Sequence, residues 1–517
     1  MQQGAKSTIL VLDFGGQYCH LIGRRIREQG VYSEIVPHDI TPKELQRLRK
    51  QFHVKGVVLS GGPASVYEPR APRPDPGILG VDIPMLGLCY GHQLIVHMAG
   101  GTVEPAKQRE YGIAYVTIDK PVGVLKGVGG KEKVWMSHGD TVFGLPAGYE
   151  ILAHSENCPV AAFRHQEKPI YGLQWHPEVV HTEKGMQMLH NFIFEVCQCE
   201  ANWKMEDVVE KAKNEIRTTV GEGKAIIALS GGIDSSVATV LAAKAIGNRL
   251  TAVFVDHGFM RENEPEFVKK VFQKFKINLE MVNARERFLA KLAGIVDPEA
   301  KRKVIGEEFI RVFEEIAERS GAEYLIQGTI YPDRIESGVR KLSDKIKTHH
   351  NVAGLPTRMK FKKIEEPLRD LYKDEVRKVA QLLGLPKELV GRQPFPGPGL
   401  AVRIIGELTQ ENIDIAKKAD QIVREEIEAS GLHEQLWQYF AVVTDTNATG
   451  VKGDARAYGA VIAVRVVESR EAMTASFAKL PYAVLERIST RITNEVPQVT
   501  HVVYDITHKP PATIEWE

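Results

Sequence analysis

The chain has 517 residues, of which 43% are hydrophobic and 26% charged, and this length predicts about two to four domains with well-formed cores. The formal net charge of +1 argues against a general nucleic-acid-binding surface, which usually carries a strong basic excess. No apolar run is long enough for a membrane span and no secretory signal opens the chain, so we expect a cytoplasmic protein without a membrane partner.

The N-terminal third alternates short apolar segments with helical stretches, which is typical of a parallel α/β sheet. The expected strands are residues 8–13, 57–60 and 85–88, each followed by a glycine-rich turn. All five cysteines lie in the first 200 residues. Because the set is odd and sparse, it does not indicate a disulfide framework.

Residues 87–91 read Gly-Leu-Cys-Tyr-Gly and place Cys89 where a strand turns into a helix. A nucleophile between two glycines on such a turn stands above the sheet, and the following helix favours the thiolate. A buried structural cysteine is the alternative interpretation. The segment 171–178 favours catalysis, because His176 could take the thiol proton and Glu178 could orient the imidazole. His138 is a rival for the role of base.

The turn Gly61-Gly62-Pro63 is suited to giving a backbone N–H to an oxyanion. Together with Cys89, His176 and Glu178, it resembles the triad glutamine amidotransferases. The resemblance implies that Cys89 forms a γ-glutamyl thioester, which water hydrolyses after ammonia has left. The residues that it implies for the oxyanion and for glutamine are Gly62, Tyr90, Gln93, Ser137 and His138.

Residues 230–236 read Ser-Gly-Gly-Ile-Asp-Ser-Ser after the apolar run 225–229, which indicates a buried strand that turns into a helix. Glycines let backbone N–H groups surround an anion, and the helix adds its positive end. The Walker lysine is absent. A plain Gly/Ser turn is the alternative, but the loop resembles that of enzymes that cleave ATP to AMP and pyrophosphate. The expected ATP ligands are Ser230, Gly231, Gly232, Asp234, Ser235 and Ser236, with Asp234 also the candidate ligand of Mg²⁺.

The next expected strand, residues 251–255, ends before Asp256-His257-Gly258, and residues 325–329 repeat this layout. Ligands of open parallel sheets bind beyond the carboxyl ends of the strands, so these loops should face one site, with Val255 among the ATP-binding residues. The basic runs 297–303 and 341–350 could be solvated helix faces. For residues 341–356 we favour a basic lid over the triphosphate.

Two segments near the C-terminus are unusual. Residues 391–403 contain three prolines and three glycines, together with Phe395 and two arginines, which favours a rigid ligand loop over a plain linker. The last residues carry Ile514 and Trp516 behind Pro510-Pro511. A terminus of this composition is more consistent with a segment tucked into a site than with a frayed end.

Phe-Pro-Gly-Pro-Gly-Leu at 395–400 and Lys-Pro-Pro-Ala-Thr-Ile-Glu-Trp-Glu at 509–517 are similar to the glutamine-hydrolysing GMP synthetases, and the resemblance runs from Thr8 to Glu517. It departs locally at Gly16, Ala353 and residues 444–449. The resemblance implies amination of XMP through an adenylyl intermediate, with ATP, Mg²⁺ and glutamine as co-reactants. The candidate XMP-binding residues are Arg302, Arg403, Lys509, Thr513 and Glu515.

The expected organisation is three domains: an α/β class I glutamine amidotransferase domain at 7–198, a doubly wound parallel-sheet ATP pyrophosphatase domain at 205–392, and a small α+β domain at 393–517. The last domain should bind XMP and form a homodimer. Two alternatives remain: another enzyme with a pyrophosphate loop, such as an NAD synthetase or a tRNA thiolase, and a non-catalytic nucleotide-binding regulator. The neutral charge disfavours tRNA, and an intact set of catalytic residues disfavours the regulator.

Overall fold

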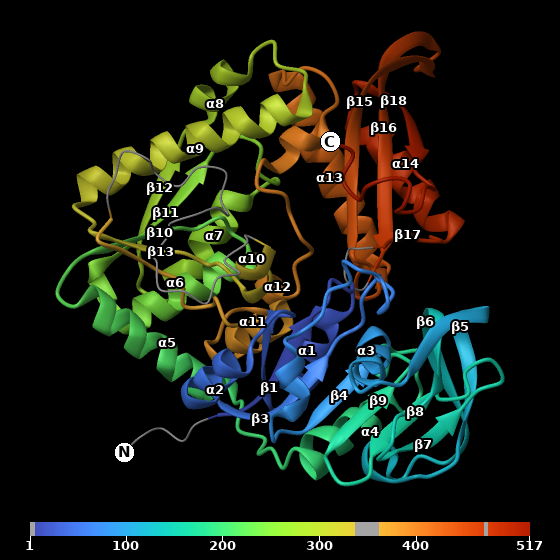
Figure 1. Cartoon of the computed structure of the whole chain (residues 1–517). Helices are drawn as coiled ribbons and strands as arrows, with labels where there is room; N and C mark the ends of the chain where they lie inside the picture. Colours follow the sequence, from blue (N-terminus) through green and yellow to red (C-terminus); the bar gives the residue numbers. More distant parts are fainter. Residues whose placement is uncertain (1–5, 337–360, 470–473) are drawn as a thin grey trace. The chain divides into compact units, whose positions relative to one another are not determined.

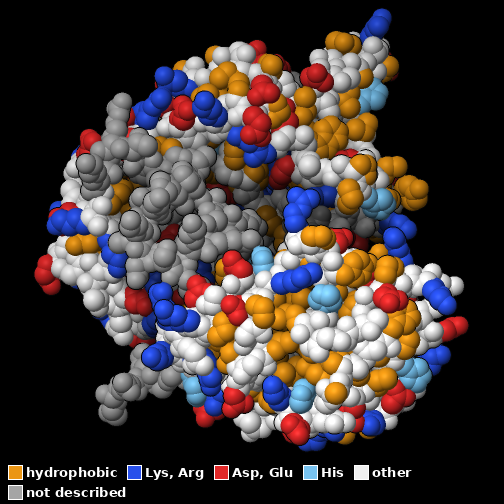
Figure 2. Space-filling view, viewed as in Figure 1, with side chains coloured by type: hydrophobic (Ala, Val, Ile, Leu, Met, Phe, Trp, Pro, Cys, Tyr) orange, Lys and Arg blue, Asp and Glu red, His pale blue; other side chains and the backbone are white. Residues whose placement is uncertain are grey.

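A computed structural model describes residues 6–336, 361–469 and 474–517. The expected basic lid at 341–356 lies outside these ranges. The chain divides into two compact units, with the boundary between Asp207 and Val208. Among the described residues, no helix is both long and apolar enough to cross a bilayer. Charged side chains of both signs are interspersed over the face shown in Figure 2, as the net charge of +1 predicts.

The first unit is built on one mixed sheet, whose nine described strands follow the order β2-β1-β3-β4-β9-β8-β7-β5-β6 (Figure 1). The strands are β1 (Ser7–Asp13), β2 (Tyr32–Pro37), β3 (His53–Leu59), β4 (Met85–Leu88), β5 (Thr102–Ile118), β6 (Gly130–Gly144), β7 (Tyr149–His154), β8 (Ala162–His165) and β9 (Ile170–Leu173). The helices are α1 (Cys19–Glu28), α2 (Pro42–Gln51), α3 (Tyr90–Met98), α4 (Gly185–His190) and the π-helix η3 (Asn191–Val196).

The expected parallel arrangement holds for β2, β1, β3, β4 and β9. The remaining strands extend the sheet in antiparallel pairs, which the sequence did not indicate. The reason lies in their composition. β1 and β4 are almost wholly buried, whereas β5 is largely exposed and therefore lacks a continuous apolar run.

The second unit contains a parallel sheet with the order β12-β11-β10-β13-β14 among its described strands. Its strands are β10 (Ala225–Ala228), β11 (Leu250–Asp256), β12 (Asn278–Asn283), β13 (Tyr324–Ile326) and β14 (Lys363–Glu365). Its helices are α5 (Met205–Val220), α6 (Ile233–Ile246), α7 (Glu264–Gln273), α8 (Arg285–Leu292), α9 (Pro298–Ser320), α10 (Tyr331–Glu336), α11 (Lys373–Leu382) and α12 (Lys387–Val390). The strand order reverses at β10, and such a switch point forms a crevice beyond the strand's carboxyl end.

The C-terminal part of this unit is a second sheet, in which β15 pairs with β16, and β16 pairs with β17 and β18. Its elements are the 3₁₀ helix η5 (Gly399–Arg403), α13 (Gln410–Ala429), β15 (Gln438–Lys452), β16 (Ala455–Glu468), β17 (Ser476–Phe477), α14 (Tyr482–Glu495) and β18 (Val499–Tyr504). One apolar cluster includes Ile226 and Val253 from the parallel sheet and Val443 and Val464 from this one. The two sheets of the second unit therefore share a hydrophobic core.

Candidate active sites

Cys89 lies on the sharp turn between β4 and α3, as its sequence context predicts. Its φ of 52° and ψ of −105° are rare for a residue with a side chain, so the turn is strained. The flanking glycines are needed for close packing. A Cβ on Gly87 would lie 2.4 Å from the Gly91 carbonyl oxygen, and a Cβ on Gly91 would lie 2.3 Å from that of Leu59.

His176 and Glu178 form a buried pair beside Cys89. The distance from His176 Nδ1 to Glu178 Oε1 is 2.7 Å, and the two side chains are 5% and 0% exposed. Burial by itself lowers the pKa of His176, but the charges and hydrogen bonds of Glu178 and Cys89 outweigh it, so the pKa lies well above its usual value. The arrangement therefore favours the charged imidazolium form of His176 beside Cys89.

Main-chain contacts fix this pair. The His176 N–H donates to the Trp135 carbonyl at 3.0 Å, and the Thr182 hydroxyl donates to the His176 carbonyl at 2.6 Å. Arg25 Nε, on α1, donates to the Glu178 carbonyl at 2.9 Å. Because both residues of the pair are held through their main chains, their side chains keep one relative geometry.

The glycine turn after β3 passes directly beside the nucleophile. A Cβ on Gly61 would lie 3.2 Å from His176 Cε1 and 3.7 Å from the Cys89 Cβ. Gly62 follows, and Tyr90 is the first residue of α3, so its N–H belongs to the helix end without intrahelical partners. Gly62 and Tyr90 line the same cavity as Cys89.

A cavity of about 640 Å³ lies over Cys89. It brings together the residues predicted for the triad base, the oxyanion and glutamine: Gly62, Tyr90, Gln93, Ser137, His138 and His176. The Gln93 side-chain amide donates to the Asp140 carbonyl at 2.8 Å and to Gln174 Oε1 at 3.1 Å. Ser137 contributes its carbonyl, 3.4 Å from Cys89 Sγ.

His138 is not arranged to serve as the base. Its Nδ1 lies 2.8 Å from the Asp140 carbonyl oxygen, and its Nε2 lies 3.1 Å from Glu110 Oε2. Both partners carry acceptor oxygens, so both ring nitrogens of His138 are already engaged by other groups of the protein. Although Asp140 follows His138 by two residues, its carboxylate accepts from the Tyr67 hydroxyl at 2.9 Å. The geometry therefore favours His176 over this rival.

The loop between β10 and α6 has the shape of an anion cradle. Gly231 has φ +79°, and a Cβ there would lie 2.9 Å from Glu264 Oε1. The Ser230 and Ser235 hydroxyls lie 3.0 Å apart, and the Gly232 N–H donates to Ser230 Oγ at 3.3 Å. Ser236 instead donates to the Gly232 carbonyl at 2.7 Å, which fixes the first turn of the helix.

A lysine that the sequence did not single out completes this loop. Lys373 Nζ, at the start of α11, lies 2.6 Å from Asp234 Oδ2. Asp234 Oδ1 is buried without a hydrogen-bond partner among the described residues. Burial raises the pKa of Asp333, and the charge of Asp234 raises it further, against the opposing effects of the Ile330 N–H and Lys373. The free oxygen of Asp234 fits a cation that is otherwise held by phosphate oxygens.

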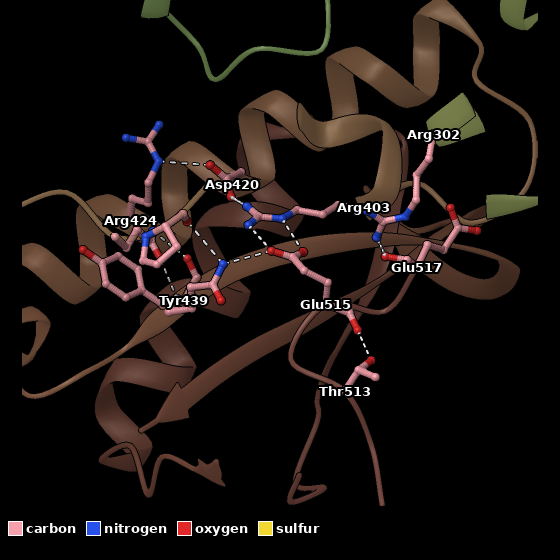
Figure 3. A network of polar contacts seen from close by, with 11 residues as sticks. Arg302, Arg403, Asp420, Arg424, Tyr439, Thr513, Glu515 and Glu517 are labelled. Carbon is pink, nitrogen blue, oxygen red and sulfur yellow. Dashed lines mark hydrogen bonds and ion pairs between the residues drawn. The ribbon is translucent and has the colours of Figure 1, made fainter. Parts of the chain in front are cut away.

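Two predicted ligands of the second unit have restricted roles. Val255 is 1% exposed inside β11, so its side chain belongs to the core and only its main chain can meet ATP. Arg403, on η5, is 0% exposed and fully paired (Figure 3). Its Nε and Nη2 donate to the Glu515 carboxylate at 3.0 and 2.9 Å, and its Nη1 donates to Asp420 at 3.2 Å.

The C-terminal segment is held in place by several contacts. Ile514 is buried as expected, whereas Trp516, which was also expected to be tucked in, is 40% exposed and donates from its ring N–H to Asp505 at 3.0 Å. Arg302 donates to the main-chain oxygen of Glu517 (Figure 3). The buried Lys301 Nζ lies 2.7 Å from Glu517 Oε2. Lys509 pairs through its main chain with Ala475 at 2.8 and 3.0 Å. The Thr513 hydroxyl donates to the Glu515 carbonyl. Thus Arg302, Arg403, Thr513 and Glu515 take part in one set of contacts around the terminus.

Sequence reasoning missed Lys373, Asp420 and Gln174. Asp420 had a usable signal, because it is an acidic residue on the buried apolar face of α13. Gln174 directly precedes the Trp-His-Pro of the triad segment. Nothing in the sequence indicated a role for Lys373, because a lysine in the first turn of an amphipathic helix is common.

Comparison with known proteins identifies the family of the chain. Residues 10–196 match the glutamine amidotransferase class-I family, 204–386 the PP-loop domain, and 425–516 the GMP synthase C terminal domain. The chain is 54% identical to GMP synthase (glutamine-hydrolyzing) of Caldicellulosiruptor saccharolyticus and 54% to that of Acetivibrio thermocellus, in each case over 98% of this chain and 99% of the relative. It is 52% identical to that of Thermosynechococcus vestitus, over 99% of this chain and 97% of the relative. The chain therefore belongs to the family of glutamine-hydrolysing GMP synthases.

Proposed function

We propose that this chain converts XMP to GMP with ATP and with ammonia released from glutamine. The observation that carries the proposal is the presence, in one chain of this family, of a Cys89–His176–Glu178 arrangement and a loop at 230–236 shaped for pyrophosphate. The first supplies nitrogen and the second supplies the energy of ATP cleavage.

In the glutaminase half-reaction, the Cys89 thiolate attacks the side-chain carbonyl carbon of glutamine. The N–H groups of Gly62 and Tyr90 stabilise the oxyanion. The His176 imidazolium, kept charged by Glu178, gives its proton to the departing nitrogen, and ammonia leaves. Water, deprotonated by His176, then cleaves the thioester and releases glutamate.

In the synthetase half-reaction, the oxygen on C2 of XMP attacks the α-phosphorus of ATP. Pyrophosphate leaves into the cradle formed by residues 230–236, where Lys373 supplies a positive charge. Ammonia adds to C2, AMP departs with the former oxygen, and loss of a proton gives GMP. Mg²⁺ held by Asp234 and phosphate oxygens would neutralise charge on the pyrophosphate.

For XMP we infer a site around the C-terminal segment. We expect the cations of Lys509 and Arg302 to bind its phosphate. Thr513 and Glu515 are candidates for polar contacts to the nucleotide. The contacts of Arg403 support a positioning role, since all of its paired nitrogens face Glu515 and Asp420.

We further infer three domains with the boundaries 7–198, 205–392 and 393–517, a cytoplasmic location and a homodimer. The dimer is supported by exposed apolar side chains of the last domain: Tyr482 is 90% exposed, Ile506 64% and Val503 48%. A cavity of about 410 Å³ beside α14 and β18 is lined by Tyr482 and Val503. A monodisperse monomer in light scattering at micromolar concentration would refute the dimer.

The test is the absorbance change of XMP in the presence of ATP, Mg²⁺ and a nitrogen source. The wild-type chain should aminate XMP with glutamine or with ammonia. Cys89→Ala should lose the reaction with glutamine and keep it with ammonia, because the two sites do separate chemistry. Absence of XMP amination by the wild type with either nitrogen source would refute the proposed acceptor.

A further inference from the structure

Arg261 is a buried cation, and one edge of its guanidinium has no hydrogen-bond partner among the described residues. It follows β11 in the turn after Asp256 and is 5% exposed. Its Nε and Nη2 are buried and have no hydrogen-bond partner among the described residues. The guanidinium carbon lies 4.4 Å from the ring centroid of Phe395, in the proline- and glycine-rich loop that the sequence marked as a ligand loop.

The neighbouring arginines show how this fold normally satisfies such a group. Arg403 donates from the same two atoms, Nε and Nη2, to the two oxygens of the Glu515 carboxylate. Arg392 donates from two nitrogens to the Glu264 carboxylate, and Arg424 donates to Asp420 at 3.0 Å. Within the part of the chain that the structure describes, Arg261 alone of these four arginines has no carboxylate partner.

Arg261 nevertheless stays charged. Burial lowers its pKa to about 10; the charge of Asp420 opposes this effect, and the charges of Arg424, Arg403 and Arg392 add to it. A pKa of about 10 still leaves a cation at neutral pH. A buried charged group whose nitrogens lack hydrogen-bond partners is costly, so a fold that keeps one is expected to use it for an anion that arrives with a ligand.

We propose that Arg261 binds two oxygens of a phosphate group of a nucleotide substrate through Nε and Nη2. The planar fork of a guanidinium matches two oxygens of phosphate at once, which a point charge does not. This assignment rests on the proposed function and adds a phosphate-binding residue that the motifs did not indicate. The phosphate belongs either to ATP or to the nucleoside monophosphate that is aminated.

The surroundings of Arg261 suit such a ligand. The Phe259 N–H donates to His257 Nδ1 at 3.2 Å, so the hydrogen of the neutral imidazole is on Nε2, a second buried donor without a partner among the described residues. The Leu400 N–H donates to the Phe259 carbonyl at 2.7 Å, which joins this turn to the ligand loop. This hydrogen bond therefore ties the turn that carries Arg261 to the ligand loop at 391–403.

There is also room for a ligand beside the turn. Arg261, His257 and Lys417 are among the residues that line a cavity of about 380 Å³. Four of the acidic lining residues, Glu262, Glu266, Glu286 and Asp414, are exposed. The fifth, Asp256, is buried and pairs with Arg285 at 2.7 Å, and Arg261 and His257 are also buried. The deeper lining thus carries donors and positive charge, which favours an anion.

The competing explanation is structural: Arg261 would only support the Phe395 ring. The two explanations differ in the ligand-free protein. If the guanidinium serves a ligand, Arg261→Met removes a buried charged group whose hydrogen bonds are not satisfied in the ligand-free protein, and it should leave the melting temperature unchanged or raise it. If it serves packing, the same change should lower the melting temperature and leave nucleotide binding intact.

The experiment measures the full-length chain with XMP alone and with ATP and Mg²⁺ alone, by calorimetric titration and by the ligand-induced shift in melting temperature. For Arg261→Met we expect the Kd of one nucleotide to rise by about tenfold or more, with loss of its thermal shift. Arg261→Lys should recover only part of the affinity, because lysine lacks the fork. Loss in the XMP arm assigns the monophosphate, and loss in the ATP arm assigns the triphosphate.

Arg319→Met serves as the matched control, since Arg319 is an exposed arginine of the same unit that pairs with Glu280. It should change neither affinity. Unchanged Kd values for both nucleotides in Arg261→Met would overturn the assignment. The wild-type amination assay tests the proposed function separately. If the chain does not aminate XMP but binds ATP in a way that depends on Arg261, the proposed function is refuted and the phosphate-binding role of Arg261 still stands.

Discussion

Replacing Glu178 by glutamine removes the negative charge of the triad while keeping the size of the side chain. The wild-type carboxylate lies 2.7 Å from His176 Nδ1, and both side chains are at most 5% exposed, so solvent screens the pair little. A hydrogen bond to a charged group contributes roughly 1.5–3 kcal/mol and a neutral one about 1 kcal/mol. Loss of the charge should therefore cost about 1.4 kcal/mol of imidazolium stabilisation, or about tenfold in rate.

Two assays read this effect. Glutamate release from glutamine should fall about tenfold or more in Glu178→Gln, and alkylation of Cys89 by iodoacetamide at pH 6.5 should slow in parallel, because less of the thiol is held as thiolate. Amination of XMP with ammonia should not change. Glu183→Gln is the control, since Glu183 is a surface partner of Lys133 with a 61% exposed side chain.

The refuting results are specific. Unchanged glutaminase and alkylation rates in Glu178→Gln would mean that the Glu178 charge does not sustain the imidazolium. A matching loss of the ammonia-dependent reaction would mean that the substitution disturbs the chain far beyond the triad.

Three further predictions follow from the structure. Lys373→Met should raise the KM for ATP about tenfold or more in the ammonia-dependent assay, because it removes the cation beside Asp234, and an unchanged KM would exclude a role at the phosphates. Asp420→Asn should lower the free energy of unfolding by about 3 kcal/mol, since the buried Arg403 and the half-buried Arg424 lose a counter-charge, whereas the exposed Asp414→Asn should change little in the same denaturant titration. Burial lowers the pKa of His92 from 6.5 to about 3, so the folded chain binds fewer protons than the unfolded chain between these values, and stability falls as the pH drops below 6.5. From pH 6.5 to 5.0 this amounts to about 2 kcal/mol, and His92→Phe should flatten that part of the pH profile in calorimetry; an unaltered slope would contradict the assignment.

The sequence by itself was sufficient wherever the information is local. The strand expected at residues 85–88 is β4, and the turn at Cys89 follows from two glycines that flank a nucleophile. His176 and Glu178 are two residues apart, so their pairing needs only a short turn. The same holds for the loop at 230–236, because a buried strand, two glycines and a helix start are consecutive in the chain.

Tertiary structure decided the pairings between distant segments. Lys373 and Asp234 are 139 residues apart, Gln93 and Gln174 are 81 apart, and the partner of Lys373 could not be read from its own helix. The antiparallel extension of the first sheet was also missed, because its exposed strands carry no continuous apolar signal. Periodicity and turn residues report local backbone geometry. Which strand ends become neighbours depends on the packing of whole sheets, and this packing brings Asp234 and Lys373 together.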